Sequence, residues 1–321
     1  LGTVLPAGAG RVLTAVFTPD DTTNYATTTI TTTIDVAKAV LTVTPESHHV
    51  ERGDAPPPLS YTLSGFVAGD APSVVSGAPA LTVSAGEASA AGRYRIEAGA
   101  GSLAASNYDF LFGSGVLTIH PKVLDVRARW GNRSVSLLGL DRSLPFLNVA
   151  AIDVLFSDPV DAGPGSLSLV GAAGPYAASR FRFDPATNTA TWTLPAPLKA
   201  DALALGLDGR IGLQSDPTVG LIAPAPIRFD VLPGDVDGNG VANAADLAAF
   251  RRPSPALRAW LDVDGDGDVD RTDQALTRRA ILQRVPPRPP RPPVPRPVRP
   301  TAPLVRSPLA PIIRPPRAPR G

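Results

Sequence analysis

The last third of the chain repeats one twelve-residue pattern of oxygen-bearing side chains. DVDGNGVANAAD begins at Asp235, and DVDGDGDVDRTD begins at Asp262, 27 positions later. Alternate residues of such a loop point inward, and a Gly at the sixth position allows the sharp turn. Gly240 and Gly267 stand at that position. Because Ca²⁺ takes about six to eight oxygen ligands, the repeat predicts a pair of calcium loops.

The predicted ligands occupy the same places in loop one (residues 235–246) and loop two (residues 262–273). Position 7 supplies a backbone carbonyl or a further carboxylate, and the other ligand positions carry side-chain oxygens. The predicted ligands of two Ca²⁺ ions are Asp235, Asp237, Asn239, Val241, Asp246, Asp262, Asp264, Asp266, Asp268 and Asp273. A single Asp/Gly/Asn stretch is commonly an ordinary turn. Two complete ligand sets in register indicate metal binding instead.

The two loops differ in charge. Loop two holds six carboxylates, and loop one holds only three. We therefore expect loop two to bind Ca²⁺ more tightly. Without a cation these carboxylates repel one another, so metal binding is expected to supply folding free energy. The prediction is a segment that is disordered without Ca²⁺ and helical with it.

Both loops end in Asp where the usual helix–loop–helix calcium motif has a bidentate Glu, and loop one follows Leu-Pro-Gly, not a helix. A duplicated loop-plus-helix unit of this kind resembles a type I dockerin, over about residues 233–284. The resemblance implies attachment to a cohesin-like protein domain through a helix that follows a loop. The segments AADLAAFRR and TDQALTRRAIL read as these helices, and PALRAWL as a short connecting one. We expect the helices to share a small core with Leu257, Trp260 and Leu261.

Two arginine pairs recur with the spacing of the loops. They are Arg251–Arg252 and Arg278–Arg279. The dockerin resemblance implies that basic residues near these places touch the partner, so these four are the predicted partner contacts. An alternative remains open, because cations late in a helix also stabilise it through the helix dipole, by about 0.3–1 kcal/mol each.

Residues 39–121 consist of short alternating runs separated by Gly, Pro, Asp and Ser, which predicts a small all-β domain. The runs are LTVTP, LSYTLSGF, LTVSA, RYRIEA, YDFLF and VLTIH. YTLSGFVAG, GAPALTVSA, GRYRI and LAASNYDFLFGSGVLTI together resemble the MBG family of mostly bacterial Ig-like repeats, over about residues 41–121. The resemblance implies a spacer or adhesive role.

The flanking segments are also predicted to be β-structure. TAVFTPDDTTNYATTTITTTIDVAKA resembles the closing half of a bacterial Ig-like repeat, and a half-sandwich has unpaired edges. AAIDVLFSDPVD and TNTATWTL resemble a further Ig-like sandwich. The predicted order is the C-terminal part of an Ig-like β repeat (1–38), an MBG-type Ig-like β domain (39–121), an Ig-like β-sandwich (122–232), a dockerin (233–284) and a disordered Pro/Arg-rich tail (285–321). The predicted fold class is thus mainly all-β sandwiches followed by a small all-α calcium-binding domain.

The tail carries eight Arg and no acid in residues 285–321. Its proline content favours polyproline II or disorder. Three interpretations stay open: a stiff basic spacer, a ligand for proline-binding domains, and an out-of-frame reading of GC-rich DNA.

Composition limits the class of protein. The chain has no Cys and no Met, which excludes disulfides and thiol chemistry and indicates a fragment or a processed product. Such a composition fits an exported bacterial protein stabilised by calcium, and no apolar run is long enough to span a membrane. The absence of Cys is itself neutral about the compartment; the resemblance to a dockerin and to bacterial Ig-like repeats implies an extracellular or cell-surface location.

No enzymatic motif is present. The chain lacks GxSxG, HExxH and a phosphate-binding glycine loop, and no carboxylate pair is framed for glycoside hydrolysis. His48 and His49 read as solvated turn residues. We therefore expect a non-catalytic attachment protein whose Ig-like modules act as stalk or adhesive spacer. Its partners would be a cohesin-like domain and a surface polysaccharide, not nucleic acid. The alternative is the non-catalytic C-terminal end of a polysaccharide-degrading enzyme whose catalytic domain lies upstream.

Overall fold

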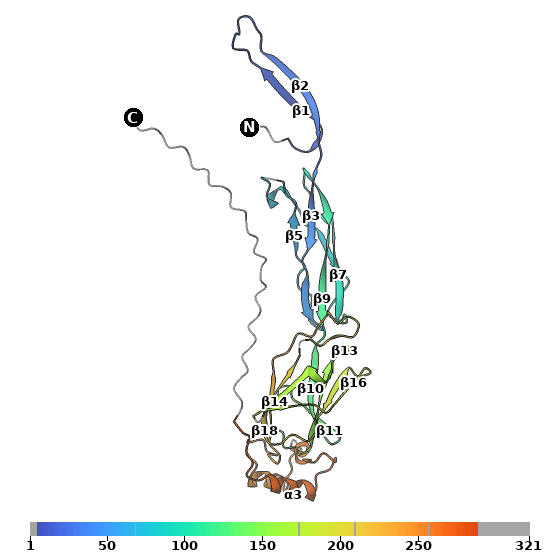
Figure 1. Cartoon of the computed structure of the whole chain (residues 1–321), viewed down its shortest axis with the longest axis vertical. Helices are drawn as coiled ribbons and strands as arrows, with labels where there is room; N and C mark the ends of the chain where they lie inside the picture. The colour runs from blue at the N-terminus through green and yellow to red at the C-terminus, as the bar shows by residue number, and fades with distance from the viewer. Residues whose placement is uncertain (1–4, 68, 173, 209, 256, 288–321) are drawn as a thin grey trace, which may run out of the picture. The chain divides into compact units, whose positions relative to one another are not determined.

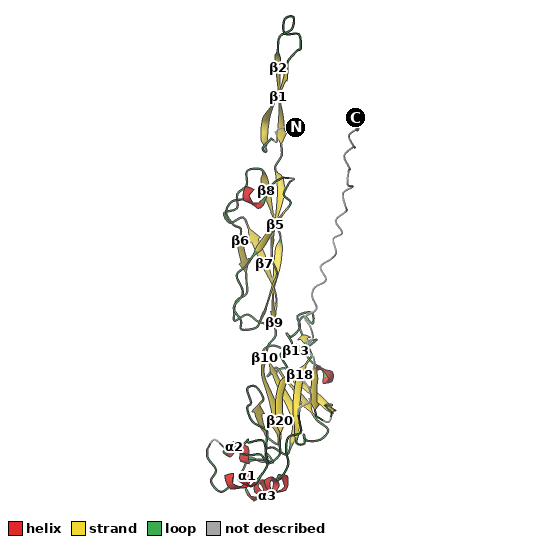
Figure 2. Cartoon of the chain, turned by 90° about the vertical axis from the view of Figure 1, so that its left-hand side faces the viewer, coloured by secondary structure: helices red, strands yellow, loops and turns green. Residues whose placement is uncertain are grey.

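The computed structural model describes residues 5–67, 69–172, 174–208, 210–255 and 257–287 (Figure 1). Within these residues the chain forms twenty strands, two 3-10 helices and three short α-helices. The expectation of a mainly β chain is confirmed, as the secondary-structure view in Figure 2 also shows. The predicted tail lies outside the described residues from 288 onward.

The N-terminal segment forms a hairpin of β1 (Gly8–Phe17) and β2 (Thr28–Val36). The two strands pair with each other and, among the described strands, with no other. Apolar side chains alternate along β1 and β2, yet Phe17 is 64% exposed and Ile30 67%. A two-stranded sheet has no second layer to cover such side chains. The expectation that this segment is half of an Ig-like repeat stays a prediction.

The next segment contains two sheets. Its strands are β3 (Ala39–Pro45), β4 (His48–Glu51), β5 (Tyr61–Ser64), β6 (Ala80–Val83), β7 (Gly92–Gly99), β8 (Tyr108–Phe112) and β9 (Ser114–His120), with a 3-10 helix at Pro72–Val74. One sheet has the order β5-β3-β8 and the other β4-β9-β7-β6. All six runs that the sequence predicted as strands are strands. Ile96, Leu117 and Ile119 form the buried centre.

The sandwich, residues 122–232, contains the largest core. Its strands are β10 (Val123–Trp130), β11 (Arg133–Ser136), β12 (Val149–Phe156), β13 (Val160–Asp161), β14 (Leu167–Gly171), β15 (Gly174–Tyr176), β16 (Arg180–Asp184), β17 (Thr189–Thr193), β18 (Asp201–Leu207), β19 (Gly212–Leu213) and β20 (Ile227–Val231), with a 3-10 helix at Pro164–Ser166. A five-stranded sheet, β11-β10-β12-β17-β16, and a four-stranded sheet, β15-β14-β18-β20, supply the buried side chains. Aliphatic residues dominate this core, around Trp192 and Phe156.

The loop–helix module, residues 233–284, carries α1 (Ala244–Ala249), α2 (Arg258–Leu261) and α3 (Arg271–Ala280). All three predicted helices are present, but α1 ends at Ala249, whereas the predicted segment AADLAAFRR continues to Arg252. Val236, Leu261 and Val263 are fully buried between the two loops and helices. Within the described residues, none of the helices is long and apolar enough to cross a membrane.

Candidate metal centre

Loop one brings together three of its predicted ligands. Asp235, Asp237 and Asp246 each offer a carboxylate oxygen, and these oxygens lie within 4.8 Å of one another. Asp235 and Asp246 are fully buried. The three residues occupy loop positions 1, 3 and 12, so the chain folds both ends of the loop around one point.

Loop two makes the same arrangement. Asp262, Asp264 and Asp273 each offer an oxygen within 4.8 Å of the others. A second group of the same kind joins Asp268 and Asp270 to Asp273. Asp270 is a residue that the ligand prediction missed, although it continues the alternation of Asp along loop two. Loop two therefore concentrates more acidic oxygen than loop one, as its sequence predicts.

The remaining predicted ligands are held by their own loop. The Asn239 amide oxygen accepts a hydrogen bond from the Val241 N–H at 3.0 Å, and its amide nitrogen donates to Asp237 at 2.8 Å. Asp266 is exposed and accepts from the Asp268 N–H at 3.0 Å. Asp266 belongs to neither acidic group among the described residues.

Each loop passes directly into a helix, and the last Asp of the loop accepts a hydrogen bond from the backbone of the residue that caps that helix. Asn243 caps α1, and its backbone N–H donates to Asp246 at 2.7 Å. Asp270 caps α3 in the same way, and its N–H donates to Asp273 at 2.9 Å. Such reciprocal capping boxes satisfy N–H groups that a helix start leaves free. The carboxylates that converge on each centre therefore also define where α1 and α3 begin.

The carboxylates of each acidic group repel one another when no cation is present, and burial and this repulsion together raise the pKa of Asp246 and of Asp273. Burial raises the pKa of Asp246, and the neighbouring charges of Asp237 and Asp235 raise it further. Burial likewise raises the pKa of Asp273, with the charge of Asp264 adding to the effect. A hard divalent cation would remove this repulsion, and an all-oxygen donor set is what Ca²⁺ prefers. The residues present thus fit Ca²⁺ at both loops.

The glycine expected at position 6 of each loop has the required backbone conformation. Gly240 has φ +85° and Gly267 has φ +113°. Residues with a Cβ rarely adopt this region. The loops turn sharply where the sequence predicted.

The sandwich holds the first ligand of each loop, a feature that the sequence analysis missed. The Ser143 hydroxyl donates to the buried Asp235 carboxylate. The Arg133 guanidinium donates to Asp262 at 2.9 Å and to the Gly267 carbonyl at 3.0 Å. Neither contact has a sequence signal, because Arg133 and Ser143 lie about a hundred residues before their partners. The position-1 carboxylates are thus oriented from outside the loop–helix module.

A stack of aromatic rings connects the sandwich to the loop–helix module. Phe146 lies between Trp130 and Trp260, with ring centroids 3.5 Å and 5.6 Å apart. The Arg142 guanidinium lies 4.1 Å from the centre of the Trp260 ring. We expected Trp260 in the core of the loop–helix module, and this was wrong. Trp260 packs on the sandwich core because Phe146 and Trp130 offer it a larger apolar surface than the short helices do.

The four predicted partner contacts are all exposed, but they are not equivalent. Arg278 and Arg279 lie in the last turn of α3. Arg251 and Arg252 lie beyond the end of α1, whose last residue is Ala249. The dipole explanation therefore applies to the second pair only. The arginine pairs repeat with a spacing of 27 residues in the sequence, but only the second pair lies within a helix.

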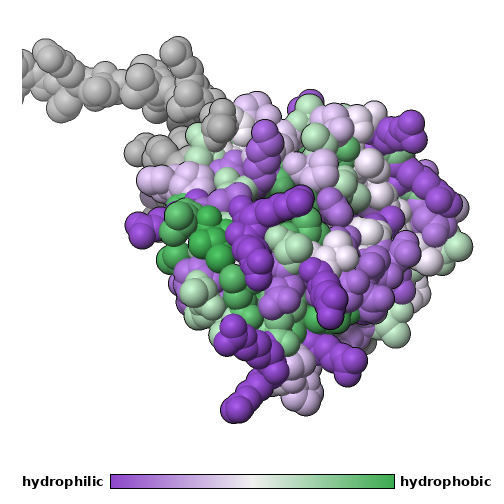
Figure 3. Space-filling model, turned by 90° about the horizontal axis from the view of Figure 1, so that it is seen from below, coloured by the Kyte–Doolittle hydropathy of each residue, from purple (hydrophilic) through white to green (hydrophobic). Residues whose placement is uncertain are grey.

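Arg279 also borders a mainly apolar hollow of 630 Å³ between α3 and the sandwich. Leu276 and Ala280 line it from α3, and Leu147 and Leu198 from the sandwich. Figure 3 shows apolar and strongly polar side chains side by side on the face seen from below in Figure 1. This face mixes the two kinds of contact that protein interfaces use.

The histidines are placed differently from the expectation. His48 and His49 lie in strand β4 and not in a turn. The His49 Nδ1 is 3.0 Å from the His120 Nε2, and the His120 Nδ1 is 2.6 Å from the Gly220 carbonyl. The pair connects β9 to a loop of the sandwich. It has no nucleophile or carboxylate hydrogen-bonded to it among the described residues, so it forms no catalytic triad there.

Comparison with known proteins identifies one segment. Residues 41–118 match the model of the MBG domain (YGX type). No curated protein matches the chain. Among solved structures, domains 1–6 of the surface layer protein SbsC match with a TM-score of 0.25 and 17% identity over 36% of this chain. The N-terminal part of the bacterial S-layer protein SbsC matches with a TM-score of 0.24 and 19% identity over 35% of this chain.

The chain spans 14% and 24% of the lengths of those two structures. The family match covers the two sheets β5-β3-β8 and β4-β9-β7-β6 and stops before the sandwich. The expected resemblance of residues 41–121 is confirmed for nearly its whole length. Residues 41–118 are thus similar to the MBG domain (YGX type).

Proposed function

We propose that this chain attaches an exported protein to a partner through a calcium-ordered, dockerin-like module at residues 233–284. The single observation that carries the proposal is the pair of acidic centres at equivalent positions of the two loops. Each centre is directly continuous with the start of a helix. Ca²⁺ bound there would order α1 and α3 together.

The partner in this proposal is a cohesin-like domain. The exposed arginines and the apolar hollow beside α3 support a protein partner, because interfaces combine an apolar centre with a polar rim. Residues 251, 252, 278 and 279 are the proposed contacts. The proposal gives the chain no catalytic role of its own.

The β modules would act as a spacer at the cell surface. The MBG match supports this part, because the family consists of mostly bacterial Ig-like repeats. The chain contains no Cys, so calcium would replace disulfides as the stabilising element of an exported chain. The proposed location outside the cell rests on the MBG match and not on the absence of Cys.

The metal part is tested by titrating the full chain with Ca²⁺ in a calorimeter. The full chain is needed because Arg133, Ser143 and Phe146 contact the module from the sandwich. We expect two binding events of unequal affinity. Absence of heat at millimolar Ca²⁺ would reject the metal site.

The attachment part is tested on a panel of immobilised cohesin domains, with Ca²⁺ and with chelator. We expect capture by at least one domain in Ca²⁺ and release in chelator. Replacing Arg278 and Arg279 by Ser should weaken capture without changing the Ca²⁺ titration. If Ca²⁺ binds but no cohesin captures the chain, the loops are stabilisers and the attachment proposal fails.

A further inference from the structure

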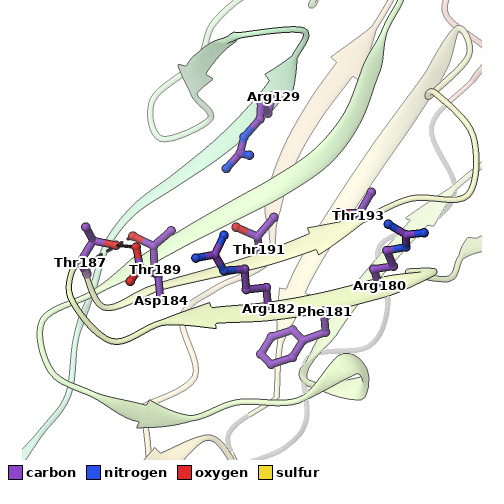
Figure 4. A pocket seen from close by; sticks show the side chains of 9 residues that line it. All are labelled: Arg129, Arg180, Phe181, Arg182, Asp184, Thr187, Thr189, Thr191 and Thr193. Carbon is purple, nitrogen blue, oxygen red and sulfur yellow. Dashed lines mark hydrogen bonds between the residues drawn. The ribbon is translucent and has the colours of Figure 1, made fainter.

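One face of the five-stranded sheet of the sandwich carries a hollow of 570 Å³. Figure 4 shows the side chains that surround it, from strands β10, β16 and β17 and the turn between the last two. We call this hollow the Arg/Thr trough; its defining residues are Arg129, Arg180, Arg182, Thr189, Thr191 and Thr193. It lies outside the metal centre, and the proposed attachment does not use it.

The strand register explains the shape of the trough. Arg180 pairs with Thr193, Thr193 with Ala151, and Ala151 with Arg129. The two middle strands therefore present short side chains, while the outer strands present long ones. Three strand spacings separate the two arginine walls, about 14 Å between backbones. A linear polymer can lie along the strands between these walls.

The charges of the trough are not balanced. Asp153 accepts three hydrogen bonds from Arg129, at 2.9, 2.7 and 2.6 Å, and one from the Thr191 hydroxyl at 2.8 Å. Asp184 accepts from the Ala186 N–H at 3.1 Å and the Thr187 hydroxyl at 3.0 Å, within its own turn.

Arg180 and Arg182 are exposed, and among the described residues neither makes an ion pair or a side-chain hydrogen bond. Two guanidinium groups on neighbouring positions of one strand face thus remain available to an anion. Both project on the side of the trough, as Figure 4 shows.

We propose that the Arg/Thr trough binds an acidic polysaccharide. Guanidinium groups pair with carboxylates in a bidentate manner, and threonine hydroxyls both donate and accept hydrogen bonds, as sugar hydroxyls do. A single-stranded nucleic acid needs aromatic platforms on which bases stack. Phe181, the aromatic residue beside the trough, packs against the buried Trp192 with ring centroids 5.1 Å apart. The trough therefore favours a carboxylate-bearing glycan over a nucleic acid.

The experiment measures binding of the full chain to polygalacturonate, with dextran as the neutral polymer, by biolayer interferometry at 0.1 M salt. The double variant Arg180→Ser/Arg182→Ser should weaken binding by about tenfold or more, because two charge-assisted contacts are lost. The matched control is Arg95→Ser/Arg210→Ser. It removes the same charge from two exposed arginines elsewhere, which pair with Glu97 and Asp208. The Arg-rich residues 285–321 are present in every variant, so their contribution is constant.

A third variant distinguishes the effect of the shape of the Arg/Thr trough from the effect of the net charge of the chain. Thr193→Gln fills the middle of the trough without altering charge and should weaken polygalacturonate binding severalfold. Binding should persist in chelator, which distinguishes this site from the calcium-dependent attachment. Equal binding of the double variant and the control would overturn the proposal. So would tighter binding of the wild-type chain to phosphatidylglycerol vesicles or to single-stranded DNA than to polygalacturonate.

Discussion

Loop one and loop two share one pattern of ligand positions, but the sandwich holds them with different chemistry. A neutral hydroxyl, from Ser143, contacts the first carboxylate of loop one, and a guanidinium, from Arg133, contacts that of loop two. The first carboxylate of loop two thus has a charged hydrogen-bond partner, whereas the guanidinium that the sandwich brings to loop one, that of Arg142, donates to the Val236 carbonyl at 2.6 Å. The sandwich therefore places a positive charge directly on the first carboxylate of loop two but only a neutral hydroxyl on that of loop one.

Removal of Ca²⁺ should have the largest effect on this comparison. With excess chelator, we expect α1 and α3 to lose their protection against amide hydrogen exchange, while β10 and β12 keep theirs, because the acidic centres repel without a cation. As Ca²⁺ is added back, α3 should regain protection before α1. Full protection of both helices in chelator would show that the packing on the sandwich suffices.

Replacing the closing ligand should separate the two sites. Asp273→Ala is expected to abolish the tighter binding event, and Asp246→Ala the weaker one. The loss of Ca²⁺ affinity at each site should exceed the about 10–100-fold that loss of a contact outside the ligand set costs. Each variant also loses the hydrogen bond from the backbone N–H of the cap residue, Asn243 or Asp270, to the replaced carboxylate. Calorimetric titration of the full chain measures both, with Asp216→Ala as the control, because Asp216 pairs with Arg93 at 3.3 Å and belongs to neither loop. The comparison would be reversed if Asp246→Ala removed the tighter event.

In the metal-free chain, the contact of Arg133 with Asp262 should contribute more to the free energy of unfolding than the contact of Ser143 with Asp235. Arg133→Ala leaves the Asp262 carboxylate, 1% exposed, without its guanidinium. We expect a loss of about 1–2 kcal/mol in the free energy of unfolding, at the lower end for a hydrogen bond to a charged group because Arg133 is half exposed. Ser143→Ala should cost less. Chemical denaturation in chelator and in Ca²⁺ measures both variants, and the Arg133 effect should shrink when Ca²⁺ compensates Asp262.

The arginine pairs should show the smallest difference. Arg278→Gln and Arg279→Gln remove cations from the last turn of α3 and should cost about 0.3–1 kcal/mol each. Arg251→Gln and Arg252→Gln, beyond the end of α1, should leave stability unchanged. Thermal unfolding of the Ca²⁺-bound chain measures this. Equal losses from both pairs would point to a role other than the helix dipole.

Much of the fold could be predicted because its signals are local. The alternating runs in residues 41–121 became strands, since an alternation of apolar and polar side chains fits a sheet with one buried face. β4, β15 and β20 were missed: β4 and β15 are only four and three residues long, and the alternating run IRFDV of β20 was overlooked. The end of α1 was also misplaced, since Leu247 and Phe250 suggested a longer helix than the module accommodates.

The candidate site also has features that local sequence predicts and features that it does not. The ligand positions and the glycine turns were readable from the sequence, because a twelve-residue loop brings its own ends together. Asp270 was overlooked as a member of an acidic group, although its position continues the pattern. The contacts of Arg133, Ser143 and Trp260 had no sequence signal at all.

By itself, the sequence determined the β domains, the two loops and the inequality of their charge, since each depends on residues close together in the chain. Only the tertiary structure decided that the sandwich orients the first ligand of each loop and that Trp260 packs outside its own module. It also decided where Arg180 and Arg182 face Arg129 across short side chains. These three features depend on which distant strands pair and in what register, and loop closure over such distances leaves no periodic trace in a sequence.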